Sequence, residues 1–168
     1  MNRGLALLLL FPLSFAAFAQ APSDWERAEE ARNWKEVELL LPGYPKESDY
    51  VEFFVSSASP FRFYLDKTSI SIGKDGVVRY TLVARSPSGA TNVSFEGIRC
   101  GTAEYRSYAF GRSDGTWSMR PTPWREIQRK SVQRWHAALN EEYLCRQGAA
   151  PNSPKEIVDG IGVGGLKR

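Results

Sequence analysis

A long stretch of the chain, from Val51 to Met119, alternates apolar and polar residues with a period of two, and turn-forming motifs interrupt it at short intervals. Successive side chains of a β-strand point to opposite faces of a sheet, so this alternation is typical of strands. Glycine supplies positive φ and aspartate bonds its own backbone, so the motifs at 73–76, 86–89 and 113–115 predict tight turns. The pattern predicts an antiparallel meander with strands at 51–55, 61–66, 69–72, 77–85, 91–98, 103–110 and 116–119.

The clearest of these strands, 77–85, carries apolar residues at its even-numbered positions, whereas Arg79, Thr81 and Arg85 occupy odd-numbered positions. A strand with this pattern in an antiparallel sheet has one face on the core and the other face in solvent. We therefore expect a sheet with one packed face and one solvated face.

Two helices are expected beside the sheet. Ser23 and Glu26 have the spacing of a capping box and open a segment rich in Glu, Ala and Arg, which predicts a helix over 24–40. A first-turn proline, Pro123, opens a second expected helix over 124–144, whose apolar side would cover the sheet. The expected fold class is α+β: an antiparallel β-meander of about five to seven strands, covered by a long C-terminal helix, with a second helix at the N-terminus.

The N-terminus has the order of features found in secretory signal peptides. A basic residue, Arg3, precedes an apolar run over 5–18, and Ala17 and Ala19 place small residues at the positions that a signal peptidase requires. The run is shorter than the roughly 20 residues that span a bilayer. We expect residues 1–19 to be a signal peptide cleaved after Ala19 and the remainder to lie in the periplasm. No cysteine stands at the cleavage point for lipid attachment, so no stable membrane anchor is expected.

Beyond the expected cleavage point, the chain is close to the commonest size of a single domain. We expect one domain over 20–150 and, because Gly, Pro and Ala are frequent beyond it, a flexible tail over 151–168. This tail also has the sequence for one short helix near 154–161. Its glycines over 160–165 follow no expected strand, so we interpret them as part of the tail and not as a phosphate-binding loop.

The chain has two cysteines, Cys100 and Cys145, both after the expected cleavage point. In an oxidising compartment such a pair usually forms a disulfide. Cys100 follows an alternating strand and Cys145 follows an apolar-faced segment, so a bond between them would tie a helix to the sheet. Two separate buried thiols are the alternative. A metal site is not expected, because the cysteines and the single His136 make too few soft ligands.

The sequence shows no arrangement typical of an active site, and we assign no catalytic residue, metal or cofactor. His136 has no evident orienting partner, so we interpret it as a surface or boundary residue. Glu96 and Glu104 lie on neighbouring expected strands, and two further acids, Asp66 and Asp114, lie at strand ends. Such carboxylates could serve a glycosidase, but any antiparallel sheet displays acids on its solvated face.

Aromatic and arginine residues are interleaved from 105 to 125 and make up a candidate binding surface. Aromatic rings beside arginines recur at protein and carbohydrate binding surfaces. A core lined by the same rings, with the arginines reaching outward, is the alternative. The candidate residues are Tyr105, Arg106, Tyr108, Arg112, Trp117, Arg120, Trp124 and Arg125.

The charges are distributed unevenly along the chain. Acidic residues predominate over 20–52 and basic residues over 99–134. These segments either face each other within the domain or leave a basic face for an anionic envelope polymer. The formal net charge of +3 is too small to indicate nucleic-acid binding.

Four runs, at 78–86, 92–100, 108–111 and 115–117, carry a family resemblance, and the most specific element within them is Glu-Gly-Ile-Arg-Cys at 96–100. On these runs the chain resembles the cryptic neisserial protein-like family of Gram-negative envelope proteins. The resemblance implies a periplasmic or lipoprotein location, no assigned biochemical activity and no catalytic residues to carry over. Many members look like lipoproteins, whereas this chain lacks the lipidation cysteine.

These observations predict a non-enzymatic periplasmic binding or accessory protein, whose partner is an unknown envelope protein or polymer and not nucleic acid. An envelope hydrolase of the glycosidase type and a structural subunit of a larger envelope complex are the alternatives. A deep pocket with two convergent acids would favour the hydrolase. An exposed aromatic surface edged by arginines would favour binding.

Overall fold

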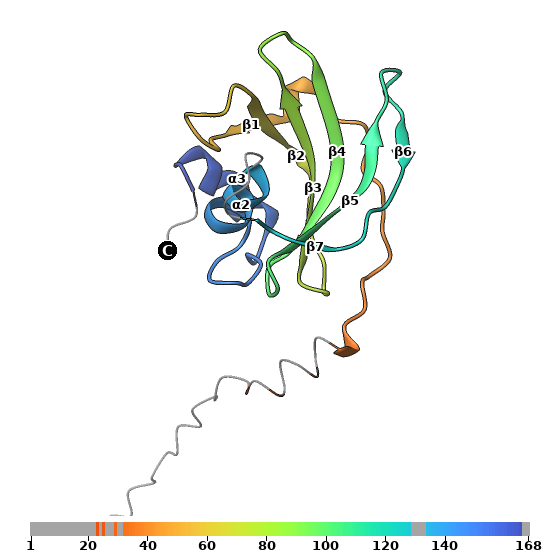
Figure 1. Cartoon of the computed structure of the whole chain (residues 1–168), viewed down its shortest axis with the longest axis vertical. Coiled ribbons are helices and arrows are strands. Elements are labelled where there is room, and N and C mark those ends of the chain that lie inside the picture. Colours follow the sequence, from red (N-terminus) through yellow and green to blue (C-terminus); the bar gives the residue numbers. More distant parts are fainter. Residues whose placement is uncertain (1–22, 24, 26–28, 30–31, 129–133, 166–168) are drawn as a thin grey trace, which may run out of the picture. The chain divides into compact units, whose positions relative to one another are not determined.

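The computed structural model describes residues 23, 25, 29, 32–128 and 134–165 of the chain (Figure 1). Residues 1–34 and 35–168 form two separate units, and the sheet and its helices belong to the second. The expected signal peptide, 1–19, lies outside the described residues. None of the helices in the described part of the chain is both long enough and apolar enough to cross a membrane.

Seven strands in the described part of the chain form one antiparallel sheet, in which strands that follow one another in sequence lie side by side from β1 to β6. The predicted meander is confirmed. A short strand, β7, returns to pair with β5 (Figure 1). A 3-10 helix, η1 (Glu47–Asp49), precedes the sheet. The strands are β1 (Tyr50–Phe53), β2 (Arg62–Ile72), β3 (Val77–Arg85), β4 (Thr91–Arg99), β5 (Glu104–Gly111), β6 (Trp117–Met119) and β7 (Arg125–Glu126).

The second and third expected strands form one continuous strand, β2, with a bulge that follows Asp66. The Asp66 carboxylate accepts hydrogen bonds from the amide and the hydroxyl of Thr68. The Ser69 hydroxyl donates to the Asp66 carbonyl and accepts from the amide of Thr81 in β3. These side chains satisfy backbone groups where the extra residues interrupt the ladder.

Helical segments lie on one face of the sheet, which we call the helix-bearing face (Figure 1). An α-helix of one turn, α2 (Trp135–Ala138), continues directly into a π-helical stretch, η2 (Leu139–Leu144). A third helix, α3 (Pro154–Gly162), contacts β1 and β2. The face therefore carries two short helical segments in place of the single long helix that the sequence predicted.

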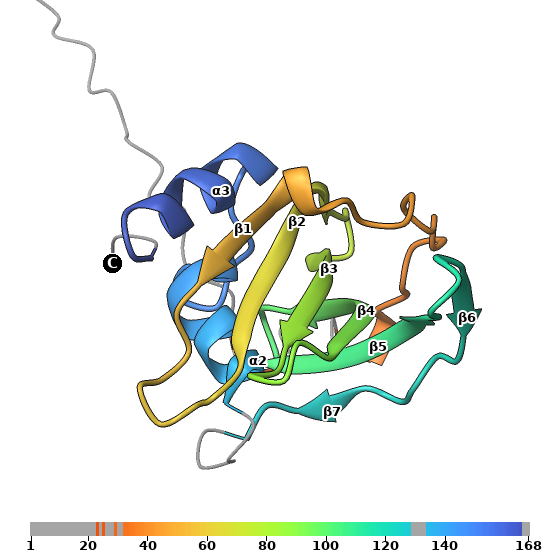
Figure 2. The ribbon, with the colours of Figure 1, turned by 90° about the horizontal axis from the view of Figure 1, so that it is seen from above.

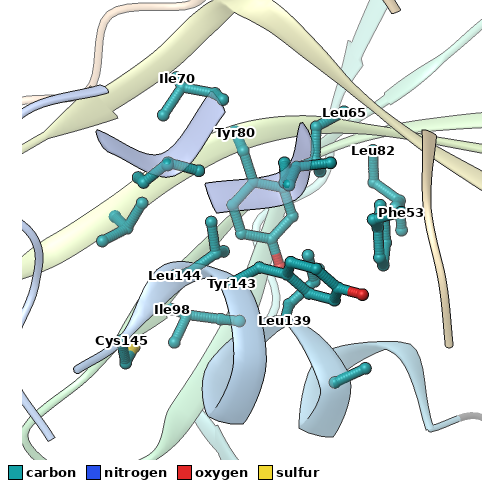
Figure 3. Close-up of a cluster of buried hydrophobic side chains, with 14 of the residues drawn as sticks. Phe53, Leu65, Ile70, Tyr80, Leu82, Ile98, Leu139, Tyr143, Leu144 and Cys145 are labelled. Atoms are coloured by element: carbon teal, nitrogen blue, oxygen red, sulfur yellow. The ribbon is translucent and has the colours of Figure 1, made fainter. Parts of the chain in front are cut away.

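The main hydrophobic core lies between the helix-bearing face and these helices. Tyr80 and Leu82 project from β3 toward the η2 side chains Leu139, Tyr143 and Leu144 (Figure 3). Tyr80, Leu139 and Leu144 are fully buried. Burial of each large side chain stabilises the fold by about 1.5–3 kcal/mol, so this contact holds the helices on the sheet.

The prediction of a helix over 124–144 was wrong for its first part. Residues 125 and 126 form β7, and the Ile127 amide donates to the carbonyl of Ala103. Residues 129–133 lie outside the described residues, and helix is found only from Trp135. Pairing with β5 satisfies backbone groups of this segment and buries Ile127, which outweighs the helical signal of Pro123.

The prediction of one solvated face was also wrong. Arg79, Thr81 and Val83 of β3 point away from the helices, yet each is at most 5% exposed. An extended segment over residues 35–46, which we call the strap, crosses this second face, which we call the strap face. Figure 2 shows the strap in orange, passing from β1 toward β6 on the side away from α2 and α3.

The strap replaces the second half of the helix that was expected over 24–40, and the first half of that helix falls largely outside the described residues. The backbone of the strap is extended because its polar groups bond to the sheet. The Val37 amide donates to Asp75, and Trp117 of β6 donates to the carbonyl of Pro42. Leu39 packs against a small core of Phe95, Tyr108 and Ala109.

The C-terminal helix α3 lies within the segment that was expected to be a flexible tail, 151–168. Ser153 caps it by accepting a hydrogen bond from the amide of Glu156, and Pro154 occupies its first turn. Ile157 and Ile161 from this helix are buried in the main core. The short helix that the sequence allowed near 154–161 is therefore present, and it contributes to the core.

The predicted disulfide between Cys100 and Cys145 is present, with the Cα atoms 5.5 Å apart. Cys100 follows the end of β4 and Cys145 follows the end of η2. Both lie where an element ends, so the bond forms at a normal Cα separation and ties the helical segment to the sheet.

Candidate functional site

A cleft of about 930 Å³ opens on the helix-bearing face. It is bounded by the loop between β1 and β2, by residues of β3, β4 and β5, and by Arg134 and Trp135 at the start of α2. Its walls are predominantly apolar. Its apolar lining residues include Phe61, Phe63, Leu82, Ala84, Phe110 and Trp135.

Residues 91–94 and Glu96 of β4 line the cleft, and the even-numbered ones become more buried toward its inner end. Asn92 is exposed, Ser94 is 8% exposed and Glu96 is 4% exposed. The cleft therefore becomes deeper along β4 and ends at a buried carboxylate. The register places Ser94 opposite Leu82 and Glu96 opposite Tyr80, so the polar inner end lies directly beside the hydrophobic core.

Three side chains surround the Glu96 carboxylate. His136 Nε2 lies 2.8 Å from Oε2, and the Tyr80 hydroxyl donates to the same oxygen over 3.3 Å. The Ser94 hydroxyl donates to Oε1 over 2.7 Å. Burial alone would raise the pKa of Glu96, but the hydrogen bonds and the charge interaction with His136 outweigh it and lower this pKa below its usual value. Glu96 is thus ionised at neutral pH.

His136 is buried and paired, so the interpretation of it as a surface or boundary residue was wrong in placing it near solvent. The ring of Tyr105 stacks on the imidazole, with centroids 3.7 Å apart. The indole nitrogen of Trp135 also lies 3.2 Å from Nε2. A single ring nitrogen cannot donate to Glu96 and accept from Trp135 at once, and the shorter contact to the carboxylate assigns the proton to Nε2.

The arrangement of Ser94, Glu96 and His136 does not match a nucleophile–base–acid triad. In such a triad the histidine stands between the hydroxyl and the carboxylate, whereas here the carboxylate stands between the other two. The Ser94 proton is directed to Glu96, and no contact with His136 activates it. The geometry suits hydrogen bonding and orientation better than nucleophilic attack.

The other carboxylates considered from the sequence lie elsewhere. Glu104 accepts from Thr102 and pairs with Arg99, and Asp66 stabilises the β2 bulge. Asp114 accepts from Thr116 in the turn between β5 and β6, which lowers its pKa. Among the described residues that line the cleft, Glu96 is the single acid, so a pair of carboxylates flanking a glycosidic bond is not formed there. No cluster of three or more metal-ligating side chains occurs in the described ranges.

The aromatic and arginine residues of the candidate binding surface do not all share one face. Tyr105 faces His136 on the helix-bearing side, whereas Tyr108 is buried on the strap face. On that face, Trp117 packs against Tyr44 of the strap with ring centroids 5.3 Å apart, and Arg106 lies over the ring of Trp124. Arg112, Arg120 and Arg125 are exposed. The rings thus pack within the protein, and three of the four arginines extend outward.

A charged network lies beneath the strap. Glu36 Oε2 accepts from Arg106 over 2.7 Å, and Glu36 Oε1 accepts from Tyr108 over 2.5 Å and from Arg79 over 3.3 Å. Arg79 also pairs with Asp75, with 2.6 Å between Nη2 and Oδ2. Burial and the hydrogen bond to Glu36 raise the pKa of Tyr108. Glu36 of the strap therefore pairs with Arg79 of β3 and Arg106 of β5 on the strap face.

The cleft and its buried carboxylate were not identified from the sequence, although one signal was present. Ser94 and Glu96 stand at even positions of β4, and the pairing of β3 with β4 brings them beside Leu82 and Tyr80, on the packed face. Polar residues that the register places on an apolar face indicate either a hydrogen-bonded core or a site. The pairing of Glu96 with His136, which lies 40 residues further along the chain, cannot be inferred from the strand register.

The fold is an antiparallel α+β meander with a strap on one face and a cleft on the other. A family model, described as the CNP1-like family, matches residues 29–162. The chain therefore belongs to the CNP1-like family, and the resemblance found in the sequence is confirmed. No curated protein and no solved structure matches the chain.

Proposed function

We propose that this protein is an exported envelope protein that binds a small, largely apolar molecule in the cleft without transforming it. The cleft itself is the observation that carries this proposal. Its volume of about 930 Å³ falls in the range of small-molecule sites, and such sites have apolar walls with a few convergent polar groups. The inner end formed by Ser94 and Glu96 provides such polar groups.

The exposure of aromatic side chains at the cleft supports the same proposal. Phe61 is 40% exposed and Phe110 is 39% exposed, and both line the cleft. Trp135 lines it as well and stacks on Phe63, with centroids 5.6 Å apart. A bound apolar molecule would remove these rings from water, and each Å² of apolar surface buried contributes roughly 25 cal/mol.

A neutral apolar dye tests the cleft directly. N-phenyl-1-naphthylamine is expected to bind with a saturable rise in fluorescence at one molecule per chain. Replacing Ala84 with Phe places a ring in the cleft and is expected to weaken dye binding by at least about tenfold, because the occupied volume excludes the ligand. Titration of the purified protein with the dye measures both.

A matched control uses the same substitution elsewhere. Ala149 is exposed and does not line the cleft, so Ala149→Phe should leave dye affinity unchanged. Unfolding curves of both variants establish that each is folded. Equal dye binding by the Ala84→Phe variant and the wild type would contradict the proposal.

We further propose that the protein acts in the periplasm, after cleavage of residues 1–19. The signal-like N-terminus supports export, and the Cys100–Cys145 disulfide suits an oxidising compartment. The native product is expected to begin at Gln20. Mass spectrometry of protein recovered from the periplasmic fraction checks this, and an intact Met1 on cytosolic protein would contradict it.

A further inference from the structure

We propose that the cleft selects an uncharged apolar molecule that carries a hydroxyl group at one end, with the hydroxyl bound by Ser94 and Glu96. The inference rests on the proposed ligand-binding function and names the class of ligand. It follows from the polar atoms at the inner end of the cleft, which remain able to accept a hydrogen bond after their contacts within the protein are counted.

The acceptor count identifies the free positions. An ionised carboxylate offers about four lone-pair positions, two on each oxygen. Oε2 of Glu96 accepts from His136 and from Tyr80, which uses both of its positions. Within the described ranges, Oε1 accepts from Ser94 alone, so one position remains. The Ser94 oxygen, having donated its proton, also keeps acceptor capacity.

The hydrogen-bond donors around Glu96 already point toward its carboxylate. The Ser94 hydroxyl, the Tyr80 hydroxyl and His136 Nε2 all point to the carboxylate. A ligand group that reaches this end therefore meets acceptors and must supply a donor. An ether or ketone oxygen there would face the lone pairs of Glu96 and Ser94 without a hydrogen bond, which is unfavourable in a buried site.

The surroundings of Glu96 favour a neutral hydrogen-bond donor on the ligand over a charged group. A ligand carboxylate brings no proton to the free position on Oε1, so at the inner end it would meet the lone pairs of an ionised carboxylate that is 4% exposed, while the cation that also lines the cleft, Arg134, is exposed to water. An ammonium group would lose its hydration in a cleft with apolar walls, while the single free position on Oε1 offers it one hydrogen bond. A hydroxyl loses less hydration and makes the same bond.

Competition for the dye measures this selectivity on the wild-type protein. 1-Octanol is compared with 1-methoxyoctane, which is uncharged but has no donor, with octanoate and with octylammonium, all at pH 7. The alcohol is expected to displace the dye at a concentration at least about tenfold lower than any of the other three. The ether is the sharpest comparison, because it is the more apolar molecule and differs in the donor.

A substitution at the carboxylate tests the assignment to Glu96. Glu96→Gln removes the negative charge and keeps the size of the side chain, so it should reduce the preference for 1-octanol over octanoate several-fold. Should this variant not fold, the wild-type comparison of alcohol with ether still decides the inference. A folded variant with an unchanged preference would overturn the role of Glu96.

The outcomes separate this inference from the function on which it rests. The inference is overturned if the ether, octanoate or octylammonium displaces the dye at the same concentration as the alcohol. It is also overturned if none of the four displaces a dye that Ala84→Phe excludes. Either result leaves a ligand-binding cleft. Failure of the dye to bind the wild-type protein overturns the proposed function itself.

Discussion

Replacing both Cys100 and Cys145 with serine is expected to lower the free energy of unfolding by about 2–5 kcal/mol. The bond closes a loop with a sequence separation of 45 residues, which contains β5, β6, β7 and the helical segment of the main core. Without it, the unfolded chain regains the conformational freedom that the loop restricts. Urea unfolding of the double variant and the wild type, monitored by tryptophan fluorescence, measures the difference.

The environment of the two cysteines adds to this loss. Cys100 is 3% exposed and Cys145 is 6% exposed, both within the main core. Serine hydroxyls at these positions need hydrogen-bond partners in an apolar surrounding. Replacing each cysteine with alanine instead separates the two effects, because alanine removes the bond without burying a hydroxyl.

The reduced wild-type protein provides a control without any substitution. Unfolding in the presence of a reductant should give a free energy close to that of the double alanine variant. An unchanged unfolding midpoint in both cases would show that the bond does not hold the helical segment on the sheet.

The meander was predictable because its signals are local. Alternation within each strand and the glycine turns at Gly76, Gly89 and Gly115, all with positive φ, set the order of the strands without long-range information. The disulfide was predictable for a related reason, since two cysteines leave one intramolecular pairing.

The helices and the strap were mispredicted because their contacts are distant in sequence. Glu36 bonds to Arg106 and Tyr108, which are 70 and 72 residues further along the chain. These bonds outweigh the helical propensity of a segment rich in Glu and Ala, a preference that tertiary contacts routinely override. The early part of the expected helix over 124–144 became strand for the same reason, through pairing with β5.

The site was only partly within reach of the sequence. Glu96 was noted as one of several acids, but its burial depends on the joining of β3, β4 and α2. The interleaved aromatic and arginine residues were noted as a surface, whereas the strap covers several of the rings. Binding of an anionic partner by the exposed Arg112 and Arg120 stays a prediction.

Arg79 connects the strap to the sheet through two carboxylates. The guanidinium is 5% exposed, the Asp75 side chain is 0% exposed and the Glu36 side chain is 20% exposed. Burial opposes the ionisation of Asp75, but the hydrogen bonds from Arg79 and from the amides of Val37 and Val77 lower its pKa. Arg79 thus supplies a positive charge that compensates the buried carboxylate of Asp75.

Replacing Arg79 with methionine is expected to lower the free energy of unfolding by about 3–5 kcal/mol at pH 7, because it removes the guanidinium that pairs with the buried carboxylate of Asp75. The folded pKa of Asp75 lies below its unfolded value, so this carboxylate stabilises the wild type above about pH 4 and the contribution is lost as the pH falls further. The difference in the free energy of unfolding between variant and wild type should therefore shrink in acid.

Arg112 provides a matched control, because it is exposed and lies in the turn that follows β5. Arg112→Met should change the free energy of unfolding by no more than about 0.5 kcal/mol. Hydrogen exchange at the Val37 amide, which donates to Asp75, should become faster in the Arg79 variant if the strap loosens. Unchanged exchange together with full stability would show that the strap is held by its apolar contacts with Phe95 and Trp117 and not by this charged network.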